Sequence, residues 1–219
     1  MKNNLISFFL FLSFYNMAFA NITLPNVFSD NMVLQRNTEI TIWGWANPKE
    51  EVKITPSWNN QEYKVVANNH AYWTIKIPTP KEGGPYTILL KGYNEISLKN
   101  ILIGEVWLCS GQSNMEMNAN WGIKNGEEEA KKAINSNIRF FSVEKASAET
   151  PQNNLSGNWV ECSPETKKKN SAVAYFFAQR ITEDLRNVPI GMIISAWGAT
   201  PAEVWIPENV IQNNKELLE

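Results

Sequence analysis

Between residues 22 and 98 the chain alternates short runs of apolar, β-branched and aromatic residues with turn-forming residues. An alternation of period two is typical of half-buried strands, and no helical period of 3.6 residues competes with it there. Asn47-Pro48 and Gly83-Gly84-Pro85 are among the turns that separate the runs. We therefore predict a small antiparallel β-sandwich domain over residues 21–100, with strands at residues 39–43, 51–54, 63–66, 72–77 and 86–90.

After about residue 100, strand-like and helix-like segments alternate. Residues 190–196 form a nearly continuous apolar run, which is typical of a strand buried on both faces of a parallel sheet. Residues 127–134 and 171–187 have helical spacing, and Pro189 ends the second of these segments. Further strands are expected at residues 101–108 and 138–143. This alternation predicts an α/β domain with a parallel sheet over residues 101–219.

The first twenty residues match the pattern of a secretory signal peptide. A basic start at Lys2 precedes an apolar stretch over residues 5–19, and Ala18-Phe19-Ala20 is a small-x-small cleavage site. Polar residues interrupt the stretch, which is shorter than the roughly 18 to 20 apolar residues that a membrane span needs. We expect the mature chain to begin near Asn21, to be exported to the periplasm or secreted, and to have no membrane association after cleavage.

The overall charge argues against nucleic acid and anionic membranes as partners. The net charge is −2, and the basic residues gather in one short cluster, Lys167-Lys168-Lys169, which is best explained as a solvated loop. Cys109 and Cys162 lack the spacing of a metal site, and none is predicted. Either one disulfide in an oxidising compartment or two buried thiols is consistent with this pair.

Ser113 lies in a glycine turn directly after the predicted strand at residues 101–108. Such a turn can present a hydroxyl at the carboxyl edge of a sheet, where backbone N–H groups can receive an oxyanion. The sequence Gly111-Gln112-Ser113-Asn114-Met115 differs from the Gly-x-Ser-x-Gly elbow of the α/β-hydrolases. Taken alone, a serine in such a turn is more often only part of the turn.

Longer strings around this serine resemble a known family. Gly104 to Met115, Phe28 to Arg36, Cys162 to Phe177 and Ser195 to Glu203 are similar, in this order, to segments of the sialate O-acetylesterase family, a branch of the Ser-Gly-Asn-His hydrolases. The resemblance implies a flavodoxin-like hydrolase domain. It also implies a carboxylic ester hydrolase that removes O-acetyl groups from sugars through an acetyl-enzyme, without a metal or organic cofactor. Sialic acid is the name-giving substrate.

The resemblance also implies roles for individual residues. Ser113 matches the nucleophile, and its own N–H is one oxyanion donor. Asn170 or Ser171 occupies the place of the second donor, where a glycine is common in such enzymes. The family carries two adjacent glycines before Thr200, whereas this chain has Gly198-Ala199. The residues expected to bind the acetylated carbohydrate are Gln112, Asn114, Gly198 and Thr200.

The base that would activate Ser113 is missing from the sequence. His70, the single histidine, lies upstream in a predicted turn, and Glu116 would be a poor base unless burial raised its pKa. In the family, a Gln-Gly-Glu-like stretch and an Asp-x-x-His block follow the segment that matches Thr200-Pro201. Neither occurs here before Glu219, so we expect a chain truncated within the hydrolase domain and inactive on its own.

Two other functions compete with this interpretation. The first is a noncatalytic carbohydrate-binding protein that uses exposed tryptophans such as Trp197 and Trp205, with Ser113 as a relic. The second is deacetylation of xylan or pectin by the same machinery. The sequence ranks neither the sugars nor the oligomeric states.

Overall fold

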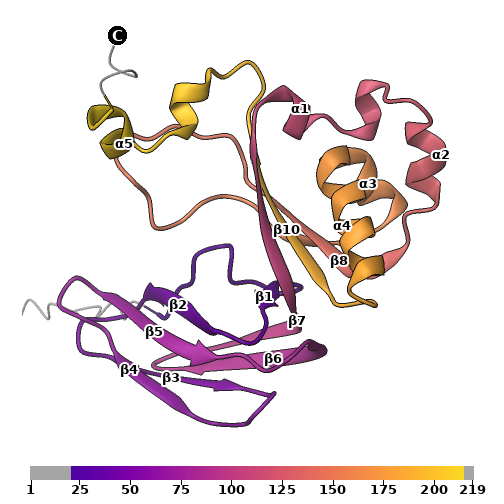
Figure 1. The fold of residues 1–219 in the computed structure, drawn as a ribbon. Helices are drawn as coiled ribbons and strands as arrows, with labels where there is room; N and C mark the ends of the chain where they lie inside the picture. The colour runs from indigo at the N-terminus through magenta and orange to yellow at the C-terminus, as the bar shows by residue number, and fades with distance from the viewer. Residues whose placement is uncertain (1–20, 215–219) are drawn as a thin grey trace, which may run out of the picture.

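The computed structural model describes residues 21–214, so the predicted signal peptide lies outside the described residues. In the N-terminal part, β2 and β5 pair antiparallel as a separate two-stranded sheet, and β4, β3 and β6 join a larger sheet of eight strands. Figure 1 shows these strands as the lower half of the molecule. The five predicted strands are confirmed, as β2 (Glu39–Trp45), β3 (Glu51–Pro56), β4 (Tyr63–Val66), β5 (Tyr72–Pro78) and β6 (Gly83–Lys91).

The N-terminal core lies between these strands. Ile42 and Trp73 of the two-stranded sheet are buried in the same apolar cluster as Ile54 and Leu90 of the larger sheet. The alternation of side chains along each strand sends every second residue into this cluster, as the burial pattern of β3 shows. The period of two seen in the sequence therefore corresponds to a core with strands on two sides.

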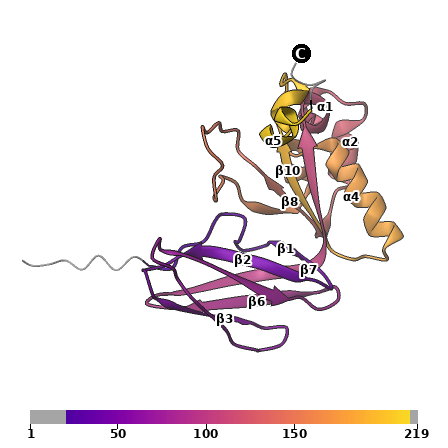
Figure 2. The same ribbon diagram turned by 60° about the vertical axis from the view of Figure 1, so that its left-hand side comes forward.

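One long strand, β7 (Glu95–Gly111), passes from the N-terminal strands to the upper half of the molecule. Its first part pairs antiparallel with β6, β1 (Val33–Gln35) pairs parallel with its centre, and its last part pairs parallel with β10. Figure 2 shows β7 rising out of the lower strands. The strand expected at residues 101–108 is thus the middle of a longer one, because partners on both sides let it continue through Asn100.

The upper half has a mainly parallel sheet. The strands β8 (Asn135–Ser142), β9 (Trp159–Cys162) and β10 (Ile190–Ala196) extend the sheet beyond β7 in the order β7-β10-β8-β9. The strands β7, β10 and β8 are parallel, and β9 is an antiparallel edge. The strands predicted at residues 138–143 and 190–196 and the mixed α/β class are confirmed.

Helices cover this sheet. The longest, α4 (Ala172–Asp184), packs on β10 and buries Ala174 and Ala178 completely. Figure 1 shows α2, α3 and α4 together on one side of the strands. Between residues 21 and 214 no helix has the length and apolar character needed to cross a membrane. The remaining helical segments are α1 (Ser113–Glu116), η1 (Ala119–Trp121), α2 (Gly126–Lys131), α3 (Pro164–Lys169), η2 (Ala202–Trp205) and α5 (Glu208–Gln212).

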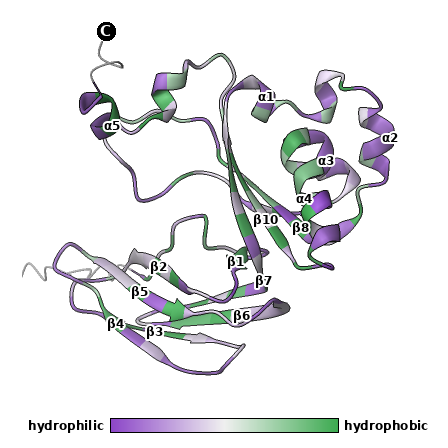
Figure 3. Cartoon of the chain, in the orientation of Figure 1, coloured by the Kyte–Doolittle hydropathy of each residue, from purple (hydrophilic) through white to green (hydrophobic). Residues whose placement is uncertain are grey.

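The hydropathy of the chain follows this arrangement. Figure 3 shows apolar residues along β7 and β10 and hydrophilic residues on α2. Both cysteines, Cys109 and Cys162, are buried free thiols in the core under α4. Burial raises the pKa of both thiols, for Cys162 to about 11. Of the two possibilities that the sequence left open, the structure has the pair of thiols.

Candidate active site

Ser113 begins α1 immediately after the end of β7. Gly111 adopts a φ of +144°, which a side chain would strain, so this glycine permits the sharp change of direction. Gln112 caps the helix. Its Oε1 accepts both the Ser113 N–H, at 3.1 Å, and the Ser113 hydroxyl, at 2.8 Å. The half-buried serine is therefore presented at the carboxyl end of a parallel strand, with the Gln112 amide beside it.

The loop after β10 meets the turn that holds Ser113. Ala196 lies opposite Gly111 in the parallel register, and the Trp197 N–H donates to the Gly111 carbonyl at 2.9 Å. A Cβ built on Gly198 would lie 3.5 Å from the Ser113 Cβ. The structure thus brings Gly198 next to Ser113, because both follow strands that end at the same edge of the sheet.

Glu116, three residues after Ser113, connects three segments of the chain. Its carboxylate accepts the Gly198 N–H at 2.6 Å and the Lys145 ammonium at 2.5 Å. The Lys145 contact and the Gly198 N–H hold the pKa of Glu116 below its ordinary value. Glu116 is therefore a carboxylate fixed by donors, and it does not have the raised pKa that a general base would need at neutral pH.

The two candidates for the second oxyanion donor lie between α3 and α4. Both line a cavity of about 140 Å³ that Glu116 also lines. The Asn170 N–H donates to the Thr166 carbonyl at 3.1 Å, and its side chain contacts the Ser142 hydroxyl, so Asn170 caps α3. The Ser171 N–H has no acceptor among residues 21–214. Of these two residues, Ser171 is therefore the one whose backbone N–H is available to an oxyanion.

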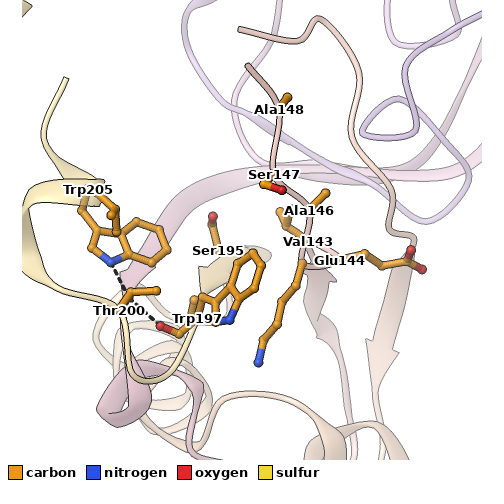
Figure 4. Close-up of a pocket in the computed structure, with 12 residues that line it drawn as sticks. Val143, Glu144, Ala146, Ser147, Ala148, Ser195, Trp197, Thr200 and Trp205 are labelled. Atoms are coloured by element: carbon orange, nitrogen blue, oxygen red, sulfur yellow. Dashed lines mark hydrogen bonds between the residues drawn. The ribbon is translucent and has the colours of Figure 1, made fainter. Parts of the chain in front are cut away.

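A larger pocket of about 590 Å³ opens beside these residues. Figure 4 shows the loop after β8, including Val143 and Ser147, on one side and the two tryptophans Trp197 and Trp205 on the other. The Thr200 hydroxyl donates to the Trp197 carbonyl at 2.6 Å and accepts the Trp205 indole N–H at 2.9 Å. Thr200 therefore lines the pocket but uses its hydroxyl to hold the tryptophan loop.

The other predicted residues lie further from this pocket. Asn114 is exposed on α1 and does not line either cavity. His70 lies in the turn between β4 and β5, where its N–H donates to the Asn68 side chain. Within residues 21–214 no three side chains of the metal-ligating kinds converge.

Sequence reasoning missed Lys145 and the contacts of Glu116. Lys145 follows β8 in a loop without any motif, and Glu116 was considered only as a base. The available signal was the position of Lys145, just after a predicted parallel strand whose carboxyl end points to the same edge as Ser113.

Residues 103–218 match the family described as carbohydrate esterase, sialic acid-specific acetylesterase. The match includes the turn that holds Ser113, the tryptophan loop and more than half of the chain. The chain belongs to this carbohydrate esterase family. The resemblance read from the four sequence strings is therefore confirmed.

Two groups of relatives agree with this assignment to the carbohydrate esterase family. The sialate O-acetylesterases of Pongo abelii and Homo sapiens are each 30% identical over 195 residues, which is 81% of this chain and 37% of theirs. The crystal structure of a carbohydrate acetylesterase from Xanthomonas citri superposes with a TM-score of 0.83 at 31% identity, covering 89% of this chain and 44% of that one. The chain thus spans less than half the length of these relatives.

Ala199, which follows Gly198 in the tryptophan loop, has the left-handed φ of +62°. The left-handed conformation costs an L-residue about 1–2 kcal/mol. Glycine removes this cost, but its greater freedom in the unfolded chain lowers stability by about 0.4–1 kcal/mol. We expect Ala199→Gly to raise the free energy of unfolding by up to about 1 kcal/mol, measured by urea denaturation.

A matched control for this substitution is Ala148→Gly in the opposite pocket wall, where φ is not positive. This change is expected to lower the free energy of unfolding by about 0.4–1 kcal/mol. Equal losses in both variants would contradict strain at Ala199.

Proposed function

We propose that this chain carries the nucleophile of an esterase that hydrolyses O-acetyl esters on sugars, with Ser113 as the attacking residue. The observation that carries the proposal is the position of Ser113 at the carboxyl end of β7, packed against Gly198, inside the segment that matches the esterase family. The sialate O-acetylesterases among the relatives support an acetylated sugar as the substrate class.

In the proposed reaction, the Ser113 Oγ attacks the acetyl carbonyl carbon and passes its proton to a base. The N–H groups of Ser113 and Ser171 stabilise the negative charge on the carbonyl oxygen. Collapse of the tetrahedral intermediate breaks the bond to the sugar oxygen, which takes up a proton and leaves. Water then hydrolyses the acetyl-enzyme to acetate and free serine. No step in this scheme requires a metal or organic cofactor.

Two features of the described residues act against this reaction. The Gln112 amide oxygen now holds both the Ser113 hydroxyl and its N–H, so it has to turn away before an oxyanion can bind there. Among residues 21–214 no histidine lies beside Ser113 to take the proton. In serine proteases, binding and the oxyanion hole alone retain about 10³- to 10⁴-fold acceleration over water. We therefore expect slow turnover from the described residues alone.

We also propose a domain organisation and a cellular location for this chain. A β-sandwich domain at residues 21–100 would precede the hydrolase domain at residues 101–219, and a signal peptide at residues 1–20 would direct export to the periplasm or the cell exterior. The shared core of β2, β5 and the larger sheet supports the first part of this organisation.

Covalent labelling tests the proposal. The chain is treated with a fluorophosphonate, and the modified peptide is identified by mass spectrometry together with acetate release from O-acetylated sialic acid. We expect slow modification at Ser113, its loss in Ser113→Ala, and normal labelling in Ser110→Ala, which changes an exposed serine of β7. A label placed elsewhere, or acetate release that is the same in Ser113→Ala, would overturn the proposal.

A noncatalytic carbohydrate-binding protein is the second candidate. The 590 Å³ pocket with Trp197 and Trp205 on one wall favours it, because indole rings stack well on the faces of sugars. Binding of an acetylated glycan that is weakened by Trp197→Ala, without any acetate release or Ser113 labelling, would support this function instead.

A further inference from the structure

The carboxylate of Glu116 is the point where three separate parts of the edge of the sheet meet. Glu116 ends α1, Gly198 follows β10 and Lys145 follows β8. Glu116 Oε2 accepts the Gly198 N–H at 2.6 Å, and Oε1 accepts the Lys145 ammonium at 2.5 Å. Because one partner of each bond is ionised, these hydrogen bonds are stronger than neutral ones.

The space around Gly198 leaves little room for a side chain. A Cβ at that position would lie 3.0 Å from Glu116 Oε2 and 3.5 Å from the Ser113 Cβ. A side chain at position 198 would therefore press on the carboxylate, whereas its distance to the serine is that of an ordinary van der Waals contact. The Glu116 side chain is 21% exposed, so solvent screens its contacts less than those of a surface ion pair.

We propose that Glu116 is a positioning residue for Ser113, holding the Gly198 backbone against the nucleophile turn while Lys145 keeps the carboxylate in place. The role rests on the proposed function, since it matters only if Ser113 reacts. Glu116 touches neither the acetyl group nor the sugar in this proposal. It acts through Gly198, whose position sets one wall beside the Ser113 hydroxyl.

The charge around Glu116 supports an ionised state at neutral pH. The Lys145 ammonium and the Gly198 N–H lower the pKa of the carboxyl. Lys169 is the other charged side chain that lines the same cavity, and it is paired with Glu165 at 2.8 Å. The contribution of the carboxylate should therefore be complete above its ordinary pKa, and be lost only as the pH falls through the lowered value.

The test combines amide exchange with labelling of Ser113. In Glu116→Ala, hydrogen exchange of the Gly198 amide should become roughly tenfold to hundredfold faster, because a hydrogen bond to a charged acceptor is lost. Phosphonylation of Ser113 should slow by about tenfold or more, since misplacement of a reacting group is costly. Glu116→Gln keeps an acceptor for the Gly198 N–H. It should therefore restore most of the protection of the Gly198 amide and most of the labelling rate of Ser113.

A control variant and a pH titration separate positioning from general stability. Asp184→Asn breaks an ion pair to Arg180 at the end of α4 away from the nucleophile turn, and should change neither measurement. The proton shift of the Gly198 amide should titrate with the lowered pKa of Glu116, and in Lys145→Met its midpoint should move upward. A structural role without contact to Gly198 would leave this midpoint unchanged.

Two outcomes are decisive. Gly198 exchange within twofold of the parent in both Glu116 variants would overturn the positioning role, whatever happens to labelling. Faster Gly198 exchange with an unchanged Ser113 labelling rate would also overturn it. If Ser113 of the parent is not labelled at all, the proposed function fails first.

Discussion

Replacing Arg139 with methionine is expected to lower the free energy of unfolding by about 3 kcal/mol or more. The side chain is 2% exposed and lies in β8. Its guanidinium donates to the Asn31 carbonyl at 2.8 Å, to the Asn100 carbonyl, and to the Asn100 side chain at 3.1 Å. Arg139 thus ties the upper sheet to two N-terminal segments, and methionine would leave their oxygens without these donors.

The backbone around Arg139 increases this cost. Asn31 and Asn100 have positive φ values of 66° and 55°. Asn31 lies in a turn and Asn100 lies within β7, and both present their carbonyls to the guanidinium. Without the arginine, these two left-handed residues lose the contacts that hold them.

Urea denaturation followed by circular dichroism measures the Arg139 effect. Arg180→Met is the matched control, because Arg180 is 73% exposed and pairs with Asp184 on the same helix. The control is expected to stay within about 0.5 kcal/mol of the parent. A loss below about 1 kcal/mol in Arg139→Met would show that water replaces the lost donors without cost.

Replacing Gly104 with alanine is expected to destabilise the fold by about 3 kcal/mol or more, at the upper end of overpacking effects. A Cβ on Gly104 would lie 1.9 Å from the Pro189 carbonyl oxygen. The oxygen is a backbone atom and the position of the Cβ is fixed by the backbone, so no rotamer relieves the clash. Pro189 cannot simply move away, because its carbonyl also accepts the Glu105 N–H at 2.9 Å, where β7 begins to pair with β10.

Gly122→Ala separates this clash from the general cost of replacing glycine. Gly122 has a φ of +80° and no atom within 4 Å of an added Cβ, so its substitution should cost only about 1–2 kcal/mol of backbone strain. Chemical denaturation of both variants gives the comparison. Similar losses of unfolding free energy in the two variants would mean that β7 and the segment before β10 can move apart at little cost in stability.

Local patterning was enough to place most elements. Each predicted strand of the N-terminal half was found, because the period of two reflects side chains that alternate between core and solvent. The main error concerned β7. The strand was expected to begin at residue 101, yet it begins at Glu95 and continues through Asn100, since β6 and β1 supply hydrogen-bond partners along its first part and its centre.

The candidate site was predicted in part. The sequence pointed to Ser113 and Gly198, and the structure brings them together because parallel strands end at one edge. Asn170 was proposed as an N–H donor, but its N–H caps α3 instead. Thr200 was proposed to bind substrate, and its hydroxyl is bonded within the tryptophan loop. Which partner each of these groups binds depends on distances in the folded chain. A sequence pattern does not contain these distances.

The sequence by itself determined the alternating strands, the mixed α/β class, the glycine turn at Ser113 and the membership of the esterase family, because each depends on residues close together in the chain. Only the tertiary structure decided that both cysteines are free, that Arg139 joins the two halves, and that Glu116 holds Gly198 against Ser113 with Lys145 beside it. These contacts join residues that lie between 29 and 108 positions apart, so only the folded chain brings them within bonding distance.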